Sequence, residues 1–430
     1  MGIIGKPSIK WGGIEMKRWT EQGVGEKIVD ITLSLNEQAL HLFETEVTTA
    51  SYSDVKASLK KFDEIGSAIE EVEKSVRNLA GHPGEYLRGM VNGFKYSARS
   101  MQGDKIPYDE LILNIQQLPS TLITDEQMAH AKELTEESLV NLGYTGTFIK
   151  KVTSWKNDTM IEPDEVVNVA ENFRELSKKS TLSRVIDLPL EDGVDWIKPI
   201  RGVFWSGYSK YTGDYRGNLT FNIDRPWTEP VLAQIMTHEA YPGHQAFYCR
   251  WDYDYQKGNL PLEASYYMIN SPTNALFEGG PETALSFLGW DDTGEITEGV
   301  NNNQKKHYRA ARHFLDYQRM YMTNACYLYN LQSMTKEEVI NYMISEGDIT
   351  EIEANNCFRF FSHPVQKTYY PSYFYGRWMI GNSYAQTPKN LREEYFKILY
   401  DTPHTTETFI KAISQLHKQE FNAFNTFINN

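Results

Sequence analysis

The chain of 430 residues is 40% hydrophobic and 23% charged, the composition of a globular protein with a large core. Its formal net charge of -14 argues against a surface that binds nucleic acid or anionic membranes. Cys249, Cys326 and Cys357 are too few and too far apart for a disulfide framework, and the N-terminus lacks the apolar segment of a secretion signal.

Helical periodicity dominates the first part of the chain, so we predict a mainly α fold. A change of composition near residue 185 is the predicted boundary between an N-terminal helical region, 1–185, and a catalytic region, 186–430, unless the two form one domain. Gly81 is placed to end the second helix. The predicted helices of this region span about 26–48, 55–76, 85–102, 107–117, 125–142, 145–156 and 163–182.

Two short strands are predicted after the boundary, over 203–205 and 219–223. They form either a plain structural hairpin or a small β-sheet whose edge strand, with Asn222, holds an extended substrate by main-chain hydrogen bonds. A helix beginning at Thr228 follows. Further helices are predicted over about 245–256, 262–270, 281–290, 302–331, 335–346, 350–362, 371–385, 388–400 and 404–428.

A possible metal site lies at the end of the helix that begins at Thr228. Two imidazoles, His238 and His244, can bind a zinc ion, and the Glu239 carboxylate can take a proton from the water that the ion activates. On an ideal helix, histidines six residues apart would point about 120° away from each other. Pro242-Gly243 interrupts the helix, and we predict that this break turns His244 toward the ion. A helix terminus with two incidental histidines is the alternative.

The third ligand is predicted to be Glu278. It lies between apolar residues and a Gly-Gly turn, where ligation of a cation would offset the cost of burying a carboxylate. Glu282 is the alternative ligand, or it accepts a hydrogen bond from a ligating histidine. Both carboxylates could instead cap a helix near Pro281. One Zn²⁺ is expected, although this ligand set also suits other divalent metals.

The motifs His-Glu-Ala-Tyr-Pro-Gly-His and Glu-Gly-Gly-Pro resemble those of a bacterial family of unknown function with the pattern H-E-x-x-P-G-H. That family looks related to the helical glutamate-zincin metallopeptidases. The resemblance covers roughly 215–380 and implies a helical zincin-like architecture with a deep groove. It implies His238, His244 and Glu278 as metal ligands and Glu239 as general base. A later segment aligns in two registers, so either Tyr370 or Tyr373 is implied to stabilise the oxyanion.

Other residues are weaker candidates for substrate binding. Arg359 and Arg377 could each hold a substrate carboxylate by paired hydrogen bonds, and His363, beside Pro364, could point into the cleft. His307 and His313, six apart on one predicted helix, are interpreted as surface or core residues.

The chain also departs from the family pattern at four positions. Gly280 and Thr283 stand where the family usually has Trp and Tyr, and Gln245 and Met320 stand where it often has His.

These features together predict a zinc-dependent hydrolase, a metallopeptidase that cleaves the amide bond of a peptide or small amide. One alternative is a metal-dependent amidase or lyase acting on a small biosynthetic metabolite. The other is a non-catalytic helical binding protein with a vestigial metal site. Because no apolar run reaches 18 residues, we expect a cytoplasmic protein with no nucleic-acid or membrane partner. The oligomeric state is left open.

Overall fold

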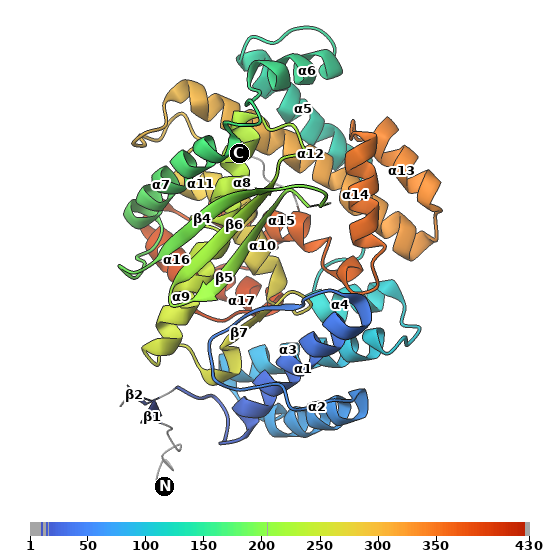
Figure 1. Cartoon of the computed structure of the whole chain (residues 1–430), viewed down its shortest axis with the longest axis vertical. Helices are drawn as coiled ribbons and strands as arrows, with labels where there is room; N and C mark the ends of the chain where they lie inside the picture. The colour runs from blue at the N-terminus through green and yellow to red at the C-terminus, as the bar shows by residue number, and fades with distance from the viewer. Residues whose placement is uncertain (1–9, 12–13, 16, 204, 426–430) are drawn as a thin grey trace.

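The computed structural model describes residues 10–11, 14–15, 17–203 and 205–425. The molecule is mainly helical, with small sheets, as predicted. Figure 1 shows the first helices gathered at one end of the molecule and the largest sheet lying across helices of the C-terminal half. No helix in the described ranges is both long enough and apolar enough to cross a membrane.

The N-terminal helices follow the predicted order. Thr124 caps α5, since its side chain accepts a hydrogen bond from the Gln127 N–H. Gly81 is a correction: it begins α3 instead of ending α2, which already stops at Val76. The bounds are α1 Val24–Phe43, α2 Phe62–Val76, α3 Gly81–Met101, α4 Tyr108–Gln116, α5 Asp125–Asn141, α6 Phe148–Asp158 and α7 Val166–Arg184.

The main sheet has the order β4-β6-β5, with β4 Gly193–Ile200, β5 Gly207–Gly213 and β6 Arg216–Asn222. Strand β6 is parallel to β4 and antiparallel to β5. The predicted strand at 203–205 is wrong for Val203 and Trp205, which lie in the connection between β4 and β5; Phe204 lies outside the described residues. The Asn222 amide donates hydrogen bonds to the carbonyls of Val203 and Trp205, which holds this connection as a loop.

A smaller sheet joins distant parts of the chain. Strand β3, Thr48–Ser51, pairs antiparallel with β7, Tyr266–Met268. The helix predicted over 262–270 is therefore wrong: only Leu262–Ala264 forms a turn of 3-10 helix. The aromatic residues Tyr266 and Tyr267 favour a strand, and both are buried where β3 supplies a partner. A two-stranded pair, β1 Lys10–Trp11 with β2 Ile14–Glu15, precedes α1.

Helices make up most of the remaining chain. The helix predicted over 281–290 begins earlier, at Asn274, and is divided at Thr283. The last helix ends at His417, eleven residues before its predicted end at 428. The bounds are α8 Glu229–Glu239, α9 His244–Gln256, α10 Asn274–Glu282, α11 Ala284–Leu288, α12 Asn302–Gln332, α13 Lys336–Ser345, α14 Glu351–Phe361, α15 Ser372–Gln386, α16 Arg392–Asp401 and α17 Thr406–His417, with 3-10 turns at Gln366–Thr368 and Lys389–Leu391.

The larger hydrophobic core contains residues from both sides of position 185, among them Leu35, Phe94, Phe277 and Met379. A second cluster packs the main sheet and α7 against α8 and α11. The division into 1–185 and 186–430 stays a prediction. For the site described next, the consequence is that α8, α9, α10 and α15 are all packed into buried surroundings.

Candidate metal centre

The helix carrying the first histidine is interrupted where the sequence predicts. Helix α8 ends at Glu239 and α9 begins at His244, with a cis peptide bond between Tyr241 and Pro242. Gly243 has a φ of -75°, outside the left-handed region that favours glycine, so the break does not depend on a positive φ at this residue. Instead, a Cβ atom at Gly243 would lie 1.7 Å from the His238 carbonyl oxygen. Only glycine fits where the chain passes this close to the end of α8.

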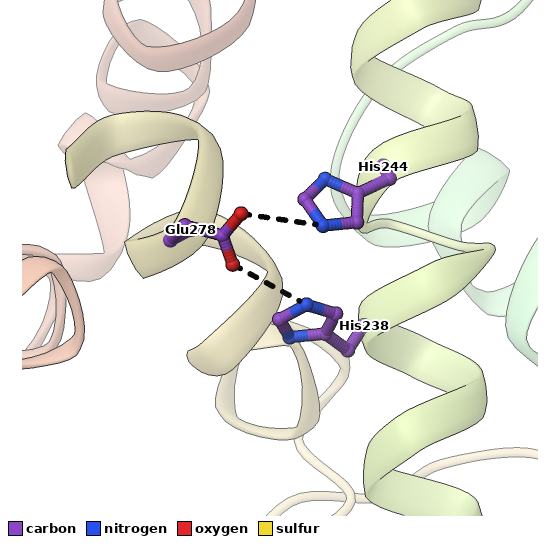
Figure 2. Close-up of side chains that lie close together, drawn as sticks. All are labelled: His238, His244 and Glu278. Carbon is purple, nitrogen blue, oxygen red and sulfur yellow. Dashed lines mark ion pairs between the residues drawn. The ribbon is translucent and has the colours of Figure 1, made fainter. Parts of the chain in front are cut away.

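The break brings both imidazoles to one carboxylate, as Figure 2 shows. His238 Nε2 lies 3.5 Å from Glu278 Oε2, and His244 Nε2 lies 3.7 Å from Glu278 Oε1. The two imidazole rings are nearly perpendicular, with centroids 4.7 Å apart. One ligand atom from each of the three residues lies within 4.8 Å of the others. Tetrahedral zinc, with bonds of about 2.0–2.2 Å, places its ligands about 3.4 Å apart, close to the two distances between the histidines and Glu278.

The buried polar atoms of this cluster suit a cation. Glu278 is 1% exposed, and its Oε2 atom has no hydrogen-bond partner in the described structure. A buried carboxylate oxygen in this state is costly unless a cation neutralises it. Burial raises the pKa of Glu278 to about 8, against the lowering effect of His238 and of the Tyr369 hydroxyl. The three residues therefore fit a bound divalent ion.

Glu282 lies where the second of the two roles considered for it would place it. Its Oε1 lies 3.1 Å from His238 Nδ1, on the side of the ring away from Glu278, and its other oxygen pairs with Arg319. A carboxylate in this position fixes the orientation of a ligating imidazole. Burial opposes ionisation, but Arg319 and His238 lower the pKa of Glu282 to about 2. Burial lowers the pKa of His238, yet Glu282, Glu239 and Glu278 together raise it to about 9.

Glu278 is positioned by a close crossing of α10 and α15. A Cβ atom at Gly279 would lie 2.3 Å from the Gly376 carbonyl oxygen. The two helices could not pack this closely if Gly279 carried a side chain. This contact brings the chain just before α15 against Glu278. There the Tyr369 hydroxyl donates a hydrogen bond of 2.6 Å to Glu278 Oε1 and lies 2.9 Å from the Tyr373 hydroxyl.

A pocket of about 270 Å³ opens on one side of the centre. Glu239 lines it, 7% exposed, and the Ser209 N–H of the edge strand β5 donates a hydrogen bond to its carboxylate. Burial raises the pKa of Glu239, and His238 opposes this rise. The other charged and aromatic residues of the lining are Arg225, His238, Glu282, Arg319, Glu353, Trp205, Trp227, Phe360, Tyr370 and Tyr373.

A buried carboxylate holds the loop between α8 and α9. Asp192 accepts hydrogen bonds from the Tyr241 hydroxyl at 2.8 Å and from the Gln245 amide at 3.0 Å, and it pairs with Lys178 at 2.8 Å. Gln245, which stands where the family pattern often has histidine, is thus part of this anchor. The family pattern's usual tryptophan would not fit at Gly280 here, because a Cβ atom there would lie 2.8 Å from the Phe247 ring.

The remaining predicted site residues lie in different places. Tyr373 and Tyr370 both line the pocket, but the Tyr370 hydroxyl donates to Cys357 Sγ at 3.4 Å. Arg377 is buried, pairs with Asp316 at 3.4 Å and lines a different cavity. Arg359 is exposed on α14.

Two of the predicted residues support the backbone. His363 Nδ1 accepts hydrogen bonds from the Val365 and Gln366 N–H groups, while its Nε2 lies near the Phe43 carbonyl. Asn222 corrects the edge-strand prediction, because it is on the central strand β6 and its amide holds the 203–205 loop. His313 is buried and contacts Ser138 and Arg312, in agreement with its interpretation as a core residue.

Four residues of the site were missed in the sequence: Tyr369, Arg319, Asp192 and Ser209. All four reach the centre only through tertiary packing, and no local pattern in the sequence marks them.

Comparison with known proteins indicates the fold but no activity. No protein-family model matches the chain, and no curated protein matches it. A crystal structure described as "the putative lipoprotein from Colwellia psychrerythraea" is similar with a TM-score of 0.57 and 15% identity over 83% of this chain. A "putative lipoprotein of unknown function from Shewanella oneidensis" aligns over 83% of the chain at 14% identity, with a TM-score of 0.45. This chain covers 66% and 64% of those two proteins. At this identity, the first likeness shows a shared fold and nothing of the chemistry.

Proposed function

We propose that the protein is a metal-dependent hydrolase, most simply a metallopeptidase that cleaves an amide bond. The observation that carries the proposal is the convergence of His238, His244 and Glu278 beside a buried fourth side chain, Glu239, which lines an open pocket. Three protein ligands with room for a substrate are the arrangement of catalytic zinc sites, whereas structural zinc sites use four protein ligands. The resemblance to glutamate-zincin metallopeptidases stays a prediction that agrees with this arrangement.

When bound, zinc would activate a water molecule and polarise the carbonyl of the substrate. The residues of the chain would do the rest. Glu239 would accept a proton from the attacking water and deliver it to the leaving amine, and the upward shift of its pKa suits that exchange near neutral pH. Tyr373 is favoured over Tyr370 as oxyanion donor, because its ring lies 6.4 Å from the His238 ring and its hydroxyl lies 2.9 Å from that of Tyr369, which is hydrogen-bonded to Glu278. The Tyr370 hydroxyl donates to Cys357 instead.

A second candidate, an amidase or lyase that acts on a small metabolite, is favoured by the size of the pocket. Its volume of about 270 Å³ is at the lower limit for small-molecule sites. Arg225 and Glu353 face each other across it at 3.5 Å, so a substrate with both an acidic and a basic group could replace their pairing. The substrate, whether peptide or small amide, and the cytoplasmic location are parts of the proposal.

Metal analysis together with digestion of a mixed-peptide library tests the proposal. We expect one zinc per chain after reconstitution and cleavage that stops when a chelator removes the metal. Stoichiometric zinc without cleavage of any peptide would favour the small-metabolite candidate. If the protein binds neither zinc nor another divalent ion, both candidate functions are wrong, and a non-catalytic helical binding protein is the remaining alternative.

A further inference from the structure

A second pocket, separate from the metal centre, lies between α7, α11, α12, α15 and α16. Its volume is about 280 Å³. Arginine dominates its lining, although the chain as a whole has a net charge of -14. The arginines come from four helices, α7, α12, α15 and α16, and are Arg184, Arg309, Arg312, Arg377 and Arg392.

The carboxylates in this pocket do not balance the arginines. Three of them line it, and Asp316 pairs with Arg377 from outside the lining, so the five arginines exceed these four carboxylates by one. Asp291 pairs with Arg312 at 2.8 Å, and Glu295 pairs with both Arg184 at 3.0 Å and Lys389 at 2.6 Å. Asp292 lies 3.7 Å from Arg309. Each carboxylate is thus already shared with a cation.

Arg392 shows the excess most clearly. Its guanidinium lies 4.5 Å from the centre of the Tyr384 ring, and its Nε atom is buried without a hydrogen-bond partner among the described residues. A buried guanidinium N–H that lacks an acceptor costs free energy, which a ligand oxygen would recover. Guanidinium groups bind carboxylate and phosphate oxygens through paired, charge-assisted hydrogen bonds.

We propose that this pocket binds a small anion that carries carboxylate or phosphate groups. The size of the pocket suits a compact molecule with two such groups better than a polymer, and partly enclosed walls strengthen its charge contacts. The proposal does not depend on the metal centre or on the proposed hydrolase activity. The two pockets are nevertheless close: Thr283 lines this one and Glu282, the preceding residue, lines the other.

Isothermal titration calorimetry of the full-length protein with inorganic phosphate, and separately with succinate, tests the proposal. We expect one of the two anions to bind at one site per chain and to bind more weakly as sodium chloride is raised. Tighter binding of phosphate would identify a phosphorylated ligand, and tighter binding of succinate a dicarboxylate. If neither anion binds, the proposal is wrong.

Two variants locate the binding. Arg392→Gln removes one guanidinium, and Ala385→Glu adds a carboxylate at an exposed lining position where no packing is lost. Each should weaken binding at least tenfold, which corresponds to one charge-assisted hydrogen bond. Arg225→Gln, the same charge change in the metal pocket, is the matched control and should leave binding within twofold. Binding that survives Ala385→Glu, or that is lost in Arg225→Gln, would overturn the assignment. Thermal melts establish that each variant is folded.

Discussion

The metal centre and the second pocket, named the arginine pocket after its lining, have opposite imbalances of charge. At the metal centre three carboxylates, Glu239, Glu278 and Glu282, are buried with Arg319 as the fixed cation beside them. In the second pocket the arginines outnumber the carboxylates. Isolated buried charges are costly, and their cost falls when an ion of opposite sign is bound. The comparison supports both proposals, a cation from solution at the first site and an anion at the second.

One helix contributes to both sites. Arg309 and Arg312, near the start of α12, line the second pocket, and Arg319, two turns later, orients Glu282 at the metal centre. Asp316 lies between them and pairs with Arg377 at 3.4 Å. Because α12 supplies cations to both sites, the two sites must be distinguished by variants that affect one and spare the other.

The largest expected effect comes from Glu239→Gln, which should lower turnover by about 10²–10⁴-fold, because the amide cannot accept the proton. Zinc content should stay at one per chain, since Glu239 is not a predicted ligand. Glu229→Gln, at the other end of α8 and hydrogen-bonded to Tyr308, is the matched control and should keep full turnover. Full activity of Glu239→Gln would remove the general-base role, and loss of zinc would make Glu239 a ligand.

The next effect is on metal content. His244→Ala removes one of three ligands and should leave the protein without stoichiometric zinc after dialysis, as measured by elemental analysis. His130→Ala, at an exposed position on α5, should retain one zinc per chain. Anion binding at the arginine pocket should be unchanged in both variants. If His244→Ala keeps its zinc, the ligand set derived from the geometry is wrong.

The parts of this site that were predictable from the sequence are the local ones. His238, Glu239, Pro242 and His244 lie within one short segment, so their spacing and the helix break could be worked out from backbone geometry. Glu278 could be inferred as well, because a carboxylate among apolar residues and glycines is an uncommon choice unless it binds something.

Long-range packing was not predictable in the same way. Tyr369 meets Glu278 only because Gly279 and Gly376 allow two helices to cross closely, and no local pattern shows that contact. Similarly, the run around Tyr266 and Tyr267 is apolar enough to suit a buried helix or a buried strand. Its strand partner, β3, is more than two hundred residues away in the sequence.

A smaller effect, a gradual change of zinc affinity, is expected when the pH is varied. Zinc must displace the protons held by His238, with its pKa raised to about 9, and by Glu278, with its pKa raised to about 8, whereas burial lowers the pKa of His244 and keeps it neutral. Apparent zinc affinity should therefore rise tenfold or more per pH unit from pH 6 to 8 and level off above pH 9. Competition with a chromophoric chelator measures this slope. A flat profile would mean that both ligands are already deprotonated in the free protein.

Unlike zinc affinity, the affinity of the arginine pocket for succinate should not change with pH over the range 7 to 9. Arginine keeps its charge throughout. Burial and Arg312 lower the pKa of His313, next to Arg312, well below its usual value, and burial raises the pKa of Tyr384 to about 12. Calorimetry at the two ends of this range checks the contrast, and a strong pH dependence would show that a group outside this lining controls binding.

The smallest expected effect comes from a substitution that changes the geometry of the metal centre without changing its charge. In Gly243→Ala the new methyl group would meet the His238 carbonyl, so the loop must shift, at a cost of about 1–3 kcal/mol in the free energy of unfolding. Gly66→Ala, inside α2 with open space around the added methyl, should instead stabilise the protein by about 1 kcal/mol. Urea titrations measure both changes.

The shift in Gly243→Ala should also weaken zinc binding while succinate binding is retained, because the loop turns His244 toward Glu278 and contributes nothing to the arginine pocket. Equal stability of the two variants would mean that the loop between α8 and α9 can relax, and the close approach at Gly243 would then not be what holds His244 in place.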